Sequence, residues 1–441
     1  MAEKPRVSFH TLGCRLNQAE TSSIAKSFRE HQYQLVSENE TADVSVINTC
    51  TVTEHSDAKN RQLIRALHRK NPAACIAVIG CYSQMAAESI QKLEGVKLVM
   101  GNAEKLELVN HIERARKSDT PLLINPKISR KTFSEPVFPW KNLTTRSYLK
   151  IQDGCDFMCT FCIIPFSRGR GRAREFENIL KEAKSFVEAG SKEIVLTGVN
   201  IGTFADRSYS LLTVLDALNE LPNLVRLRIS SIEPTTISEG VIARMADPDH
   251  KLVPFLHLPL QSGSNRILSQ MKRRYTNEAY AEEVRQACQQ VPDLCVGTDV
   301  MVGFPGESEE DFEETYRLLN SLPFSYFHVF PFSERKGTPA NRMEQKIRPE
   351  EKKRRGALLR ALSQQKRSKF YQEFIGKVRP VLFESPNESG DFTGYTDNFI
   401  KVSLSTSSTQ DLKNQILPVH FLETRDETVL GELVSSHSER I

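Results

Sequence analysis

Apolar positions in this chain form short runs that alternate with longer stretches of helical periodicity. Early in the chain, VSFHTL, DVSVIN and CIAVIG have the length of buried strands, while residues 18–31, 55–70 and 85–94 have the pattern of helices. Strands that alternate with helices predict a parallel sheet. We therefore expect an open parallel α/β domain over residues 4–116.

The pattern then breaks off. Residues 117–143 show no periodicity and are rich in proline, so we interpret them as a linker that packs along the surface between two domains. The residues that mark this linker are Pro121, Pro126, Pro136, Pro139 and the only tryptophan, Trp140.

A second, longer alternation occupies residues 144–372. The predicted strands are residues 148–152, 193–197, 225–230, 254–259, 296–302 and 326–331, and the predicted helices are 175–189, 209–220, 235–246, 276–290 and 308–320. Six parallel strands favour an incomplete (β/α)6 barrel. As in complete barrels, we expect the functional groups on the face that carries the carboxyl ends of the strands. A helix that opens at Pro349 and runs towards Phe374 closes this domain.

The last part of the chain, residues 374–438, changes to short runs with turn residues between them. VRPVLFES, FTGYTD, FIKVSL, ILPVHFLET and TVLGELV predict five antiparallel strands separated by Gly, Asn and Asp turns. We expect a small antiparallel β-barrel of the OB-like kind, and barrels of this pattern bind nucleic acid on one face.

Composition adds limits to this architecture. At 441 residues, the chain is longer than one hydrophobic core usually supports, and 39% hydrophobic with 26% charged residues is ordinary for globular proteins. The N-terminus has no long apolar segment and no run approaches membrane-spanning length, so we expect a cytoplasmic protein without a secretory signal or membrane segment. The net charge of +4 does not by itself predict nucleic-acid binding, which must come from local clusters.

The most specific motif is CDFMCTFC, in which Cys155, Cys159 and Cys162 have the spacing C-x3-C-x2-C. Three thiolates this close can hold three irons of a cubane cluster and leave the fourth iron without a protein ligand. A zinc site would need a second cysteine pair, which is absent, and a ferredoxin-type carrier would need a fourth cysteine nearby. The next cysteine downstream is Cys288. The motif therefore indicates a cluster with an open iron.

Three further cysteines each follow a predicted strand of the first domain: Cys14, Cys50 and Cys81. A single cysteine of this kind is usually a small buried hydrophobe. The carboxyl ends of parallel strands share one edge of a sheet, however, so the three can converge without any local motif. Cys75 lies at the opposite end of its strand, roughly 20 Å away, and we assign it to packing.

The cysteine motif with Phe161 before its last cysteine resembles the signature of radical S-adenosylmethionine enzymes. LGCRLNQAE, VINTCTV, VIGCY, KIQDGCDFMCTFC and LPLQSGS follow in that order, and together they resemble the methylthiotransferase family over nearly the whole chain. Within that family, GCRLNQAE is closer to the branch that acts on threonylcarbamoyladenosine than to the GCQMN or GCPKN branches.

The resemblance implies S-adenosylmethionine on the open iron of a 4Fe-4S cluster held by Cys155, Cys159 and Cys162, where one-electron reduction yields a 5′-deoxyadenosyl radical. It implies a second 4Fe-4S cluster on Cys14, Cys50 and Cys81, and a TRAM domain, an RNA-binding module, at the C-terminus. It also implies a set of residues around S-adenosylmethionine: Phe161, Gly198, Asn200, Glu233, Gln261, Ser262 and Gly297. From the residues alone, Gly198 and Gly297 could equally serve strand-end turns, and Glu233 could be a surface cap.

Basic residues gather directly after the cluster motif. SRGRGRAR places Arg168, Arg170, Arg172 and Arg174 on a glycine-rich segment suited to phosphate contacts, although a solvated loop would read the same way. Weaker groups are Lys272 to Arg274, and the eight basic residues between Lys352 and Lys369.

The resemblance therefore implies methylthiolation at carbon 2 of N6-threonylcarbamoyladenosine in tRNA, next to the anticodon. It also implies two partners besides tRNA, a sulfur donor and an external electron donor similar to flavodoxin or ferredoxin. The alternatives are isopentenyl-adenosine in tRNA, an aspartate of a ribosomal protein, and a non-catalytic iron–sulfur carrier or RNA scaffold. No side-chain acid or base is marked by the sequence.

Overall fold

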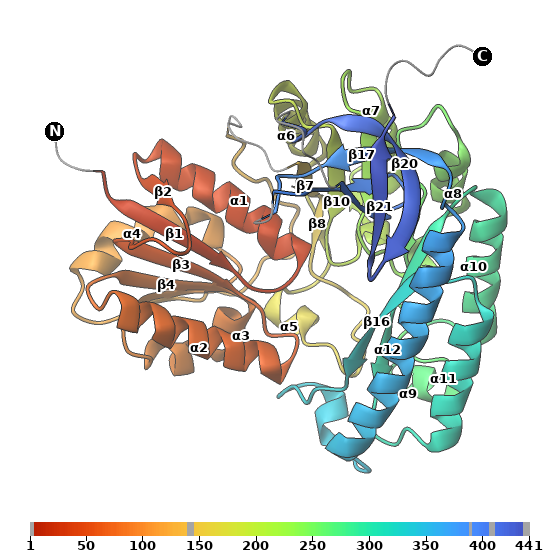
Figure 1. The fold of residues 1–441 in the computed structure, drawn as a ribbon. Helices are drawn as coiled ribbons and strands as arrows, with labels where there is room; N and C mark the ends of the chain where they lie inside the picture. The colour runs from red at the N-terminus through yellow and green to blue at the C-terminus, as the bar shows by residue number, and fades with distance from the viewer. Residues whose placement is uncertain (1–3, 139–144, 388–389, 405–410, 435–441) are drawn as a thin grey trace.

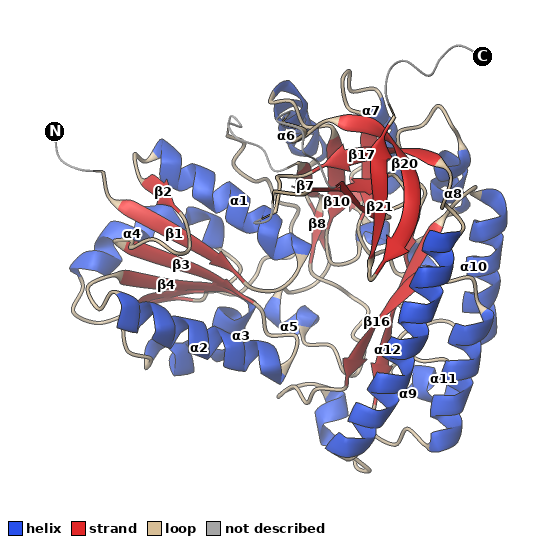
Figure 2. Ribbon diagram, in the orientation of Figure 1, coloured by secondary structure: helices blue, strands red, loops and turns tan. Residues whose placement is uncertain are grey.

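The computed structural model describes residues 4–138, 145–387, 390–404 and 411–434, and Figure 1 shows their arrangement. Two α/β units stand side by side, and a C-terminal barrel lies against the second of them (Figures 1 and 2). Pro139 and Trp140 of the predicted linker lie outside the described residues, as do the predicted domain limits at residues 143 and 438.

The first unit is a six-stranded parallel sheet in the order β2-β1-β3-β4-β5-β6. The strands are β1 (Arg6–Thr11), β2 (Gln34–Val36), β3 (Val44–Thr49), β4 (Cys75–Gly80), β5 (Val96–Met100) and β6 (Leu122–Ile124). The helices are α1 (Arg15–Glu30), α2 (Glu54–Lys70), α3 (Cys81–Gln91) and α4 (Leu108–Lys117), with the 3-10 turn η1 (Lys105–Glu107). The parallel sheet and its three predicted strands are confirmed.

Helices cover both faces of this sheet. Helices α1 and α4 pack on one face, where Phe28 and Ile112 meet Val46 and Leu98. Helices α2 and α3 pack on the other, and Ile64 of α2 lies there in the same cluster as Val78. Strands β3 and β4 are buried at every position, which explains their continuous apolar sequences.

The prediction of an irregular linker over residues 117–143 is wrong in one place. Leu122–Ile124 forms β6 and pairs with Leu98 to Met100 at the edge of the first sheet. A run of three apolar residues is too short to show a period, so only its pairing with β5 identifies it as a strand.

The second unit contains two three-stranded parallel sheets, β13-β10-β7 and β14-β15-β16. Isolated parallel bridges, Leu227 with Leu252 and Ser231 with His257, join β13 to the segment of β14. The six strands therefore follow one another around an incomplete barrel that is open between β16 and β7, as predicted.

The strands of this barrel are β7 (Arg146–Lys150), β10 (Glu193–Thr197), β13 (Arg226–Ile229), β14 (Phe255–His257), β15 (Cys295–Val302) and β16 (Tyr326–Pro331). The helices around it are α5 (Ile164–Ser167), α6 (Phe176–Glu188), α7 (Leu211–Asn219), α8 (Glu239–Ala246), α9 (Asn265–Gln270), α10 (Asn277–Gln290), α11 (Glu309–Ser321) and α12 (Pro349–Gln372). Short pieces complete it: β8 (Gln152–Asp153) pairs with β9 (Arg172–Ala173), and β11 (Ala205–Asp206) with β12 (Tyr209–Ser210).

The third unit is a closed barrel in the order β17-β18-β19-β21-β20. Its strands are β17 (Val378–Phe383), β18 (Phe392–Thr396), β19 (Lys401–Leu404), β20 (Ile416–Arg425) and β21 (Thr428–Leu433). The prediction of a wholly antiparallel barrel is wrong at one seam, because β19 and β21 run parallel. Strand direction can alternate around a closed ring only if the strand number is even, so five strands need at least one parallel seam.

The closed barrel docks where the amino-terminal ends of the core strands meet. Phe399, in the turn between β18 and β19, has a φ of 64°, which bulky residues rarely adopt. Its ring lies 4.9 Å from that of Phe255 at the start of β14, and the guanidinium of Arg228 stands 5.1 Å from its centroid. Arg226 donates to the carbonyl oxygens of Tyr395 (3.0 Å) and Pro380 (2.7 Å) of the barrel.

Replacing Arg226 should loosen this docking without unfolding the first unit. Arg226→Ala removes a buried guanidinium and leaves the carbonyls of Tyr395 and Pro380 without its two hydrogen bonds, which costs about 3 kcal/mol of local stability. Amide hydrogen exchange in β17 and β18 should then be about a hundredfold faster, while exchange in β3 and β4 stays unchanged.

The exposed Arg425 is a matched control on the same barrel, and Arg425→Ala should change stability by less than about 0.5 kcal/mol. Equal exchange in both variants would show that Arg226 does not hold the barrel.

Candidate functional site

Cys155, Cys159 and Cys162 lie in the loop that follows β7 and β8, at the carboxyl end of the first core strand. Burial raises the pKa of the Cys162 thiol to about 12, and the neighbouring thiols of Cys159 and Cys155 add to that effect. The amide N of Phe157 lies 3.5 Å from Cys155 Sγ. The three thiols lie close enough for Cys155 and Cys159 to affect the pKa of Cys162.

Cys14, Cys50 and Cys81 lie at the carboxyl ends of β1, β3 and β4, and the parallel sheet brings these ends together. An ideal Cβ on Gly13, whose φ is 109°, would come within 2.7 Å of Cys50 Cβ, so the Cys14 and Cys50 segments touch. Burial raises the pKa of Cys50 to about 11, and the nearby thiols of Cys81 and Cys14 raise it further. Cys75 opens β4 at its other end and packs in the core.

The donor chemistry of both groups suits an iron–sulfur cube. In the described ranges, no three His, Cys, Asp or Glu side chains converge closely enough to hold a single metal ion. A cube makes a different demand, because each thiolate binds a separate iron and hydrogen bonds to sulfur tune the cluster. Arg273 Nη1 lies 3.3 Å from Cys159 Sγ, and Asn102 Nδ2 lies 3.5 Å from Cys81 Sγ.

Three contacts join the two groups of cysteines across the interface between the first and second units. Asn102 Nδ2, beside Cys81, also donates to the carbonyl of Ser167 at 2.7 Å. Arg335 Nη2, beyond β16, donates at 2.6 Å to Thr51, which follows Cys50. Arg168 Nη2 donates at 2.6 Å to Asn17 Oδ1, three residues after Cys14. Each cysteine of the first unit thus lies beside a loop of the second.

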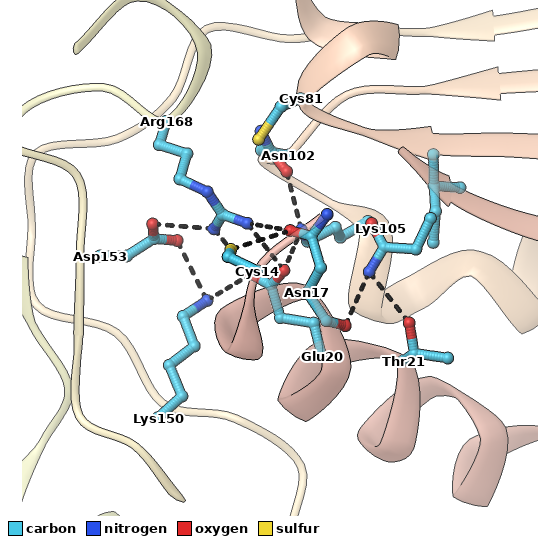
Figure 3. Close-up of polar contacts among 12 residues, drawn as sticks. Cys14, Asn17, Glu20, Thr21, Cys81, Asn102, Lys105, Lys150, Asp153 and Arg168 are labelled. Carbon is cyan, nitrogen blue, oxygen red and sulfur yellow. Dashed lines mark hydrogen bonds and ion pairs between the residues drawn. The ribbon is translucent and has the colours of Figure 1, made fainter. Parts of the chain in front are cut away.

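At the centre of this interface, Glu20 of α1 is 0% exposed and meets three cations (Figure 3). Its carboxylate pairs with Lys105 of its own unit, and with Lys150 (2.9 Å) and Arg168 (2.9 Å) of the second unit. Burial alone would raise the pKa of Glu20, but the charges of Arg168, Lys105 and Lys150 hold it well below its usual range. Asp153 joins the network through the same Lys150 and Arg168.

The predicted basic strip for RNA is therefore wrong at three of its four arginines. Arg168 and Arg174 are fully buried, and Arg172 is largely buried beside Asp153, 3.2 Å away. Arg174 pairs with Glu182 at 2.6 Å. Only Arg170 remains accessible, with 40% of its side chain exposed.

Comparison with known proteins shows which family the chain belongs to. Residues 149–319 match the radical SAM superfamily, and residues 6–101 match a family described as uncharacterized protein family UPF0004. The threonylcarbamoyladenosine tRNA methylthiotransferase MtaB of Bacillus subtilis (strain 168) is 40% identical over 95% of this chain and 94% of its own length. The chain belongs to the methylthiotransferase family of radical S-adenosylmethionine enzymes.

Other relatives of this methylthiotransferase come from two branches. MtaB of Aquifex aeolicus (strain VF5) is 38% identical over 90% of the chain and 96% of the relative. The tRNA-2-methylthio-N(6)-dimethylallyladenosine synthase of Clostridium tetani (strain Massachusetts / E88) is 32% identical over 98% of the chain and 97% of the relative. The radical S-adenosylmethionine methyltransferase TsrM from Kitasatospora setae shares the fold alone, with a TM-score of 0.55 at 14% identity over 77% of each chain. None of the described helices is long and apolar enough to span a membrane.

In this methylthiotransferase, the turn after β10 is held by a residue that the sequence does not mark. Gln152 Oε1 accepts from the amide nitrogens of Val199 and Asn200, both at 2.9 Å. A Cβ on Gly198 would lie 3.0 Å from the Gln152 carbonyl, so glycine is required there. The Asn200 amide is buried, and its Nδ2 has no hydrogen-bond partner among the described residues.

The other predicted cofactor residues fall into different surroundings. Glu233 pairs with Arg273; burial raises the pKa of this carboxyl, and the guanidinium offsets part of the rise. Gln261 has a φ of 73°, and its backbone amide donates to the backbone carbonyl of Asp299 at 2.8 Å. Gly297 leaves room for the Tyr326 ring, because a Cβ would come within 2.4 Å of it.

Two of the predicted cofactor residues are committed to the fold. Ser262 is fully buried, and its hydroxyl accepts from the Ser264 backbone amide at 3.2 Å. The Phe161 side chain is partly buried and packs against a cluster that includes Ile267 and Phe304.

Removal of the Glu20 charge should destabilise the interface strongly. Glu20→Gln leaves Lys105, Lys150 and Arg168 without their shared counter-ion, and breaking a buried pair costs about 3–5 kcal/mol. Because the folded pKa of Glu20 is depressed, its contribution is complete above the ordinary glutamate pKa of about 4.3 and is lost as pH falls further. The difference in unfolding free energy between wild type and variant should therefore be constant near neutrality and shrink below about pH 4.

Denaturant unfolding of both proteins across this pH range measures the difference. The exposed Glu188 supplies the control, since Glu188→Gln should cost less than about 0.5 kcal/mol. A Glu20→Gln penalty as small as that of the control would mean that the network does not support the interface.

Proposed function

We propose that this enzyme adds a methylthio group to carbon 2 of N6-threonylcarbamoyladenosine in tRNA, next to the anticodon, with two 4Fe-4S clusters. The observation that carries the proposal is the pair of cysteine groups held against one interface by Asn102, Arg168 and Arg335. The relatives named MtaB, at up to 40% identity, support this substrate, whereas the dimethylallyladenosine synthases among the relatives reach 34%. The motif GCRLNQAE favours the same branch.

The two groups have separate tasks in this proposal. Cys155, Cys159 and Cys162 would hold the cluster whose chemistry is reductive cleavage of S-adenosylmethionine, and Cys14, Cys50 and Cys81 would hold the cluster that carries the sulfur for transfer. Arg273 is a positioning residue, because one guanidinium donates to Cys159 Sγ and pairs with Glu233. Asn102 has the matching position beside Cys81, where it donates to Sγ and to the second unit.

The proposal also assigns the surroundings of S-adenosylmethionine. The turn at Gly198 and Asn200, held by Gln152, approaches its methionyl group, and Asn200 Nδ2 is a buried donor in need of an acceptor. Glu233 accepts from the ribose, Gln261 and Ser262 donate to polar groups of the ligand, Gly297 lies near the adenine, and the backbone of Phe161 covers the adenine. A sulfur donor and an external electron donor act as partners, and the enzyme works with tRNA in the cytoplasm.

If the two groups of cysteines have separate tasks, replacing a cysteine of each group should abolish different activities. Cys14→Ala should abolish methylthiolation of tRNA but leave reductive cleavage of S-adenosylmethionine, and iron should fall from about eight to about four atoms per chain. Cys159→Ala should abolish both reactions. Anaerobic assays of 5′-deoxyadenosine and of the modified nucleoside, with iron analysis, measure these effects.

Cys75→Ala is the matched control, because Cys75 lies in the same sheet but at the opposite strand end, and it should keep both activities and the full iron content. Loss of S-adenosylmethionine cleavage in Cys14→Ala would contradict the assignment of separate tasks to the two groups of cysteines.

The substrate assignment predicts a specific change in the RNA of cells that lack the gene. Their tRNA should contain threonylcarbamoyladenosine without its methylthio group, while methylthiolated isopentenyl-adenosine remains at its normal level. Mass spectrometry of the nucleosides measures both. The opposite pattern would assign the enzyme to the other tRNA branch, and no change in either nucleoside would favour a protein substrate.

A further inference from the structure

Three aromatic rings form a row along the edge strand of the open core barrel. Tyr326, His328 and Phe330 alternate along β16 and therefore share one face of the strand. Their ring centroids are 5.3 Å and 6.3 Å apart in succession. Phe327 and Val329, which alternate with them, point the other way and pack into the core beneath the helices.

This row is accessible because the barrel is incomplete. In a closed (β/α)8 barrel, side chains on the inner face fill the interior in packed layers. Here no described strand pairs with the free edge of β16, so His328 is exposed and Phe330 has 43% of its surface exposed. His328 and Phe330 therefore offer ring surface that the core does not cover, and such surface can stack against a ligand.

The row begins in a cavity of about 310 Å³ where all three units meet. Figure 1 shows β16 beginning beside α12 and the C-terminal barrel. The cavity is lined by cations and rings, among them Arg15, Tyr326, His328, Arg367, Tyr395 and Lys401. It therefore combines positive charge with aromatic surface.

Two of these cations have no counter-ion. Neither Arg15 nor Lys401 forms an ion pair with any residue in the described ranges, whereas Arg367 pairs with Glu427 at 2.5 Å. Arg15 instead stands over the Phe399 ring, 5.5 Å from its centroid. A half-buried guanidinium without a carboxylate leaves charge available for an anion such as a phosphodiester.

Both ends of the row lie near segments that carry the cysteines of the first unit. Arg15 follows Cys14 directly in the chain. At the other end, Ser333 Oγ accepts from the amide N of Glu54 at 3.0 Å, and Arg335 reaches Thr51 beside Cys50. A ligand that lies along β16 thus passes from the three-unit cavity to the edge where the cysteines of the first unit gather.

We propose that the rings of Tyr326, His328 and Phe330, with Arg15 and Lys401 at the cavity, bind unpaired nucleotides of the substrate RNA. Stacked bases on aromatic side chains, with the phosphates on nearby cations, are the usual chemistry of single-stranded nucleic-acid recognition. This inference rests on the proposed methylthiolation of tRNA and states how that RNA is held.

The test measures binding of an unmodified anticodon stem–loop RNA to the full-length holoenzyme by fluorescence anisotropy across a range of salt concentrations. Phe330→Leu and His328→Ala should each weaken binding about tenfold, because each removes one stacking ring. Phe330→Tyr keeps the ring and should keep the affinity. Lys401→Ala should lower the slope of log affinity against log salt by about 0.7, the value for one phosphate on a single strand.

Two matched controls separate these effects from general surface changes. Leu358 on α12 is also 43% exposed but lies off the row, and Lys413 is an exposed lysine of the same barrel that does not line the cavity. Leu358→Ala and Lys413→Ala should leave affinity and salt slope unchanged. Iron content and unfolding temperature of each variant show that it is folded.

The outcomes distinguish this inference from the function on which it rests. If wild type methylthiolates tRNA while the Phe330, His328 and Lys401 variants bind RNA like the controls, the row is not the RNA site although the function stands. If Phe330→Tyr loses as much affinity as Phe330→Leu, stacking is not the interaction. If wild type neither binds nor modifies tRNA but modifies a peptide, function and inference both fail.

Discussion

The buried carboxylate of Glu20 fixes how the first two units of the molecule meet. The Glu20 carboxylate of α1 forms ion pairs with Lys105 of its own unit and with Lys150 and Arg168 of the second unit. The cost of removing this carboxylate from water is therefore compensated fully only when both units are in contact. Arg168 follows the cluster motif and α5, and Glu20 lies two turns along the helix that begins beside Cys14. The same ion pairs therefore help to fix how the segments of the two cysteine groups lie relative to each other.

The two barrels of the molecule differ in whether they leave a free strand edge. The C-terminal barrel is closed, and its five strands accept one parallel seam to leave no free edge. The core barrel has six strands, and no strand in the described ranges pairs with the outer edge of β16, so the barrel is open on that side. Phe399 joins the two, because its ring enters the amino-terminal end of the open barrel beside Phe255 and Arg228.

Much of this architecture could be predicted from the sequence, because parallel strands that are buried on both faces have continuous apolar sequences. Strands β3 and β4 are buried on both faces and read as unbroken hydrophobic segments, and their topology alone predicts that Cys50 and Cys81 meet Cys14 at one edge. Strands β2 and β6 have three residues each and were not predicted, since pairing and not periodicity makes them strands.

The electrostatics of the site could not be predicted in this way. Arg168 and Glu20 are 148 positions apart, so nothing local distinguishes a buried arginine from one that contacts solvent or RNA. A weak signal did exist, because Lys150 and Asp153 interrupt the buried run YLKIQD, and charges within a buried strand need partners. The partners themselves, and the role of Gln152 in the turn at Gly198, follow only from the fold.

The sharing of one carboxylate between two units also bears on how such proteins diversify. A first unit grafted onto the core of a distant relative would bring Glu20 and Lys105 but would meet no counterpart of Lys150 or Arg168 unless the host core already carried them. The first two units are consequently matched to each other at this ion, whereas the C-terminal barrel meets the core through both ion pairs, such as Arg146 with Glu384, and main-chain contacts. There, Arg226 needs only main-chain carbonyls, which any sequence provides.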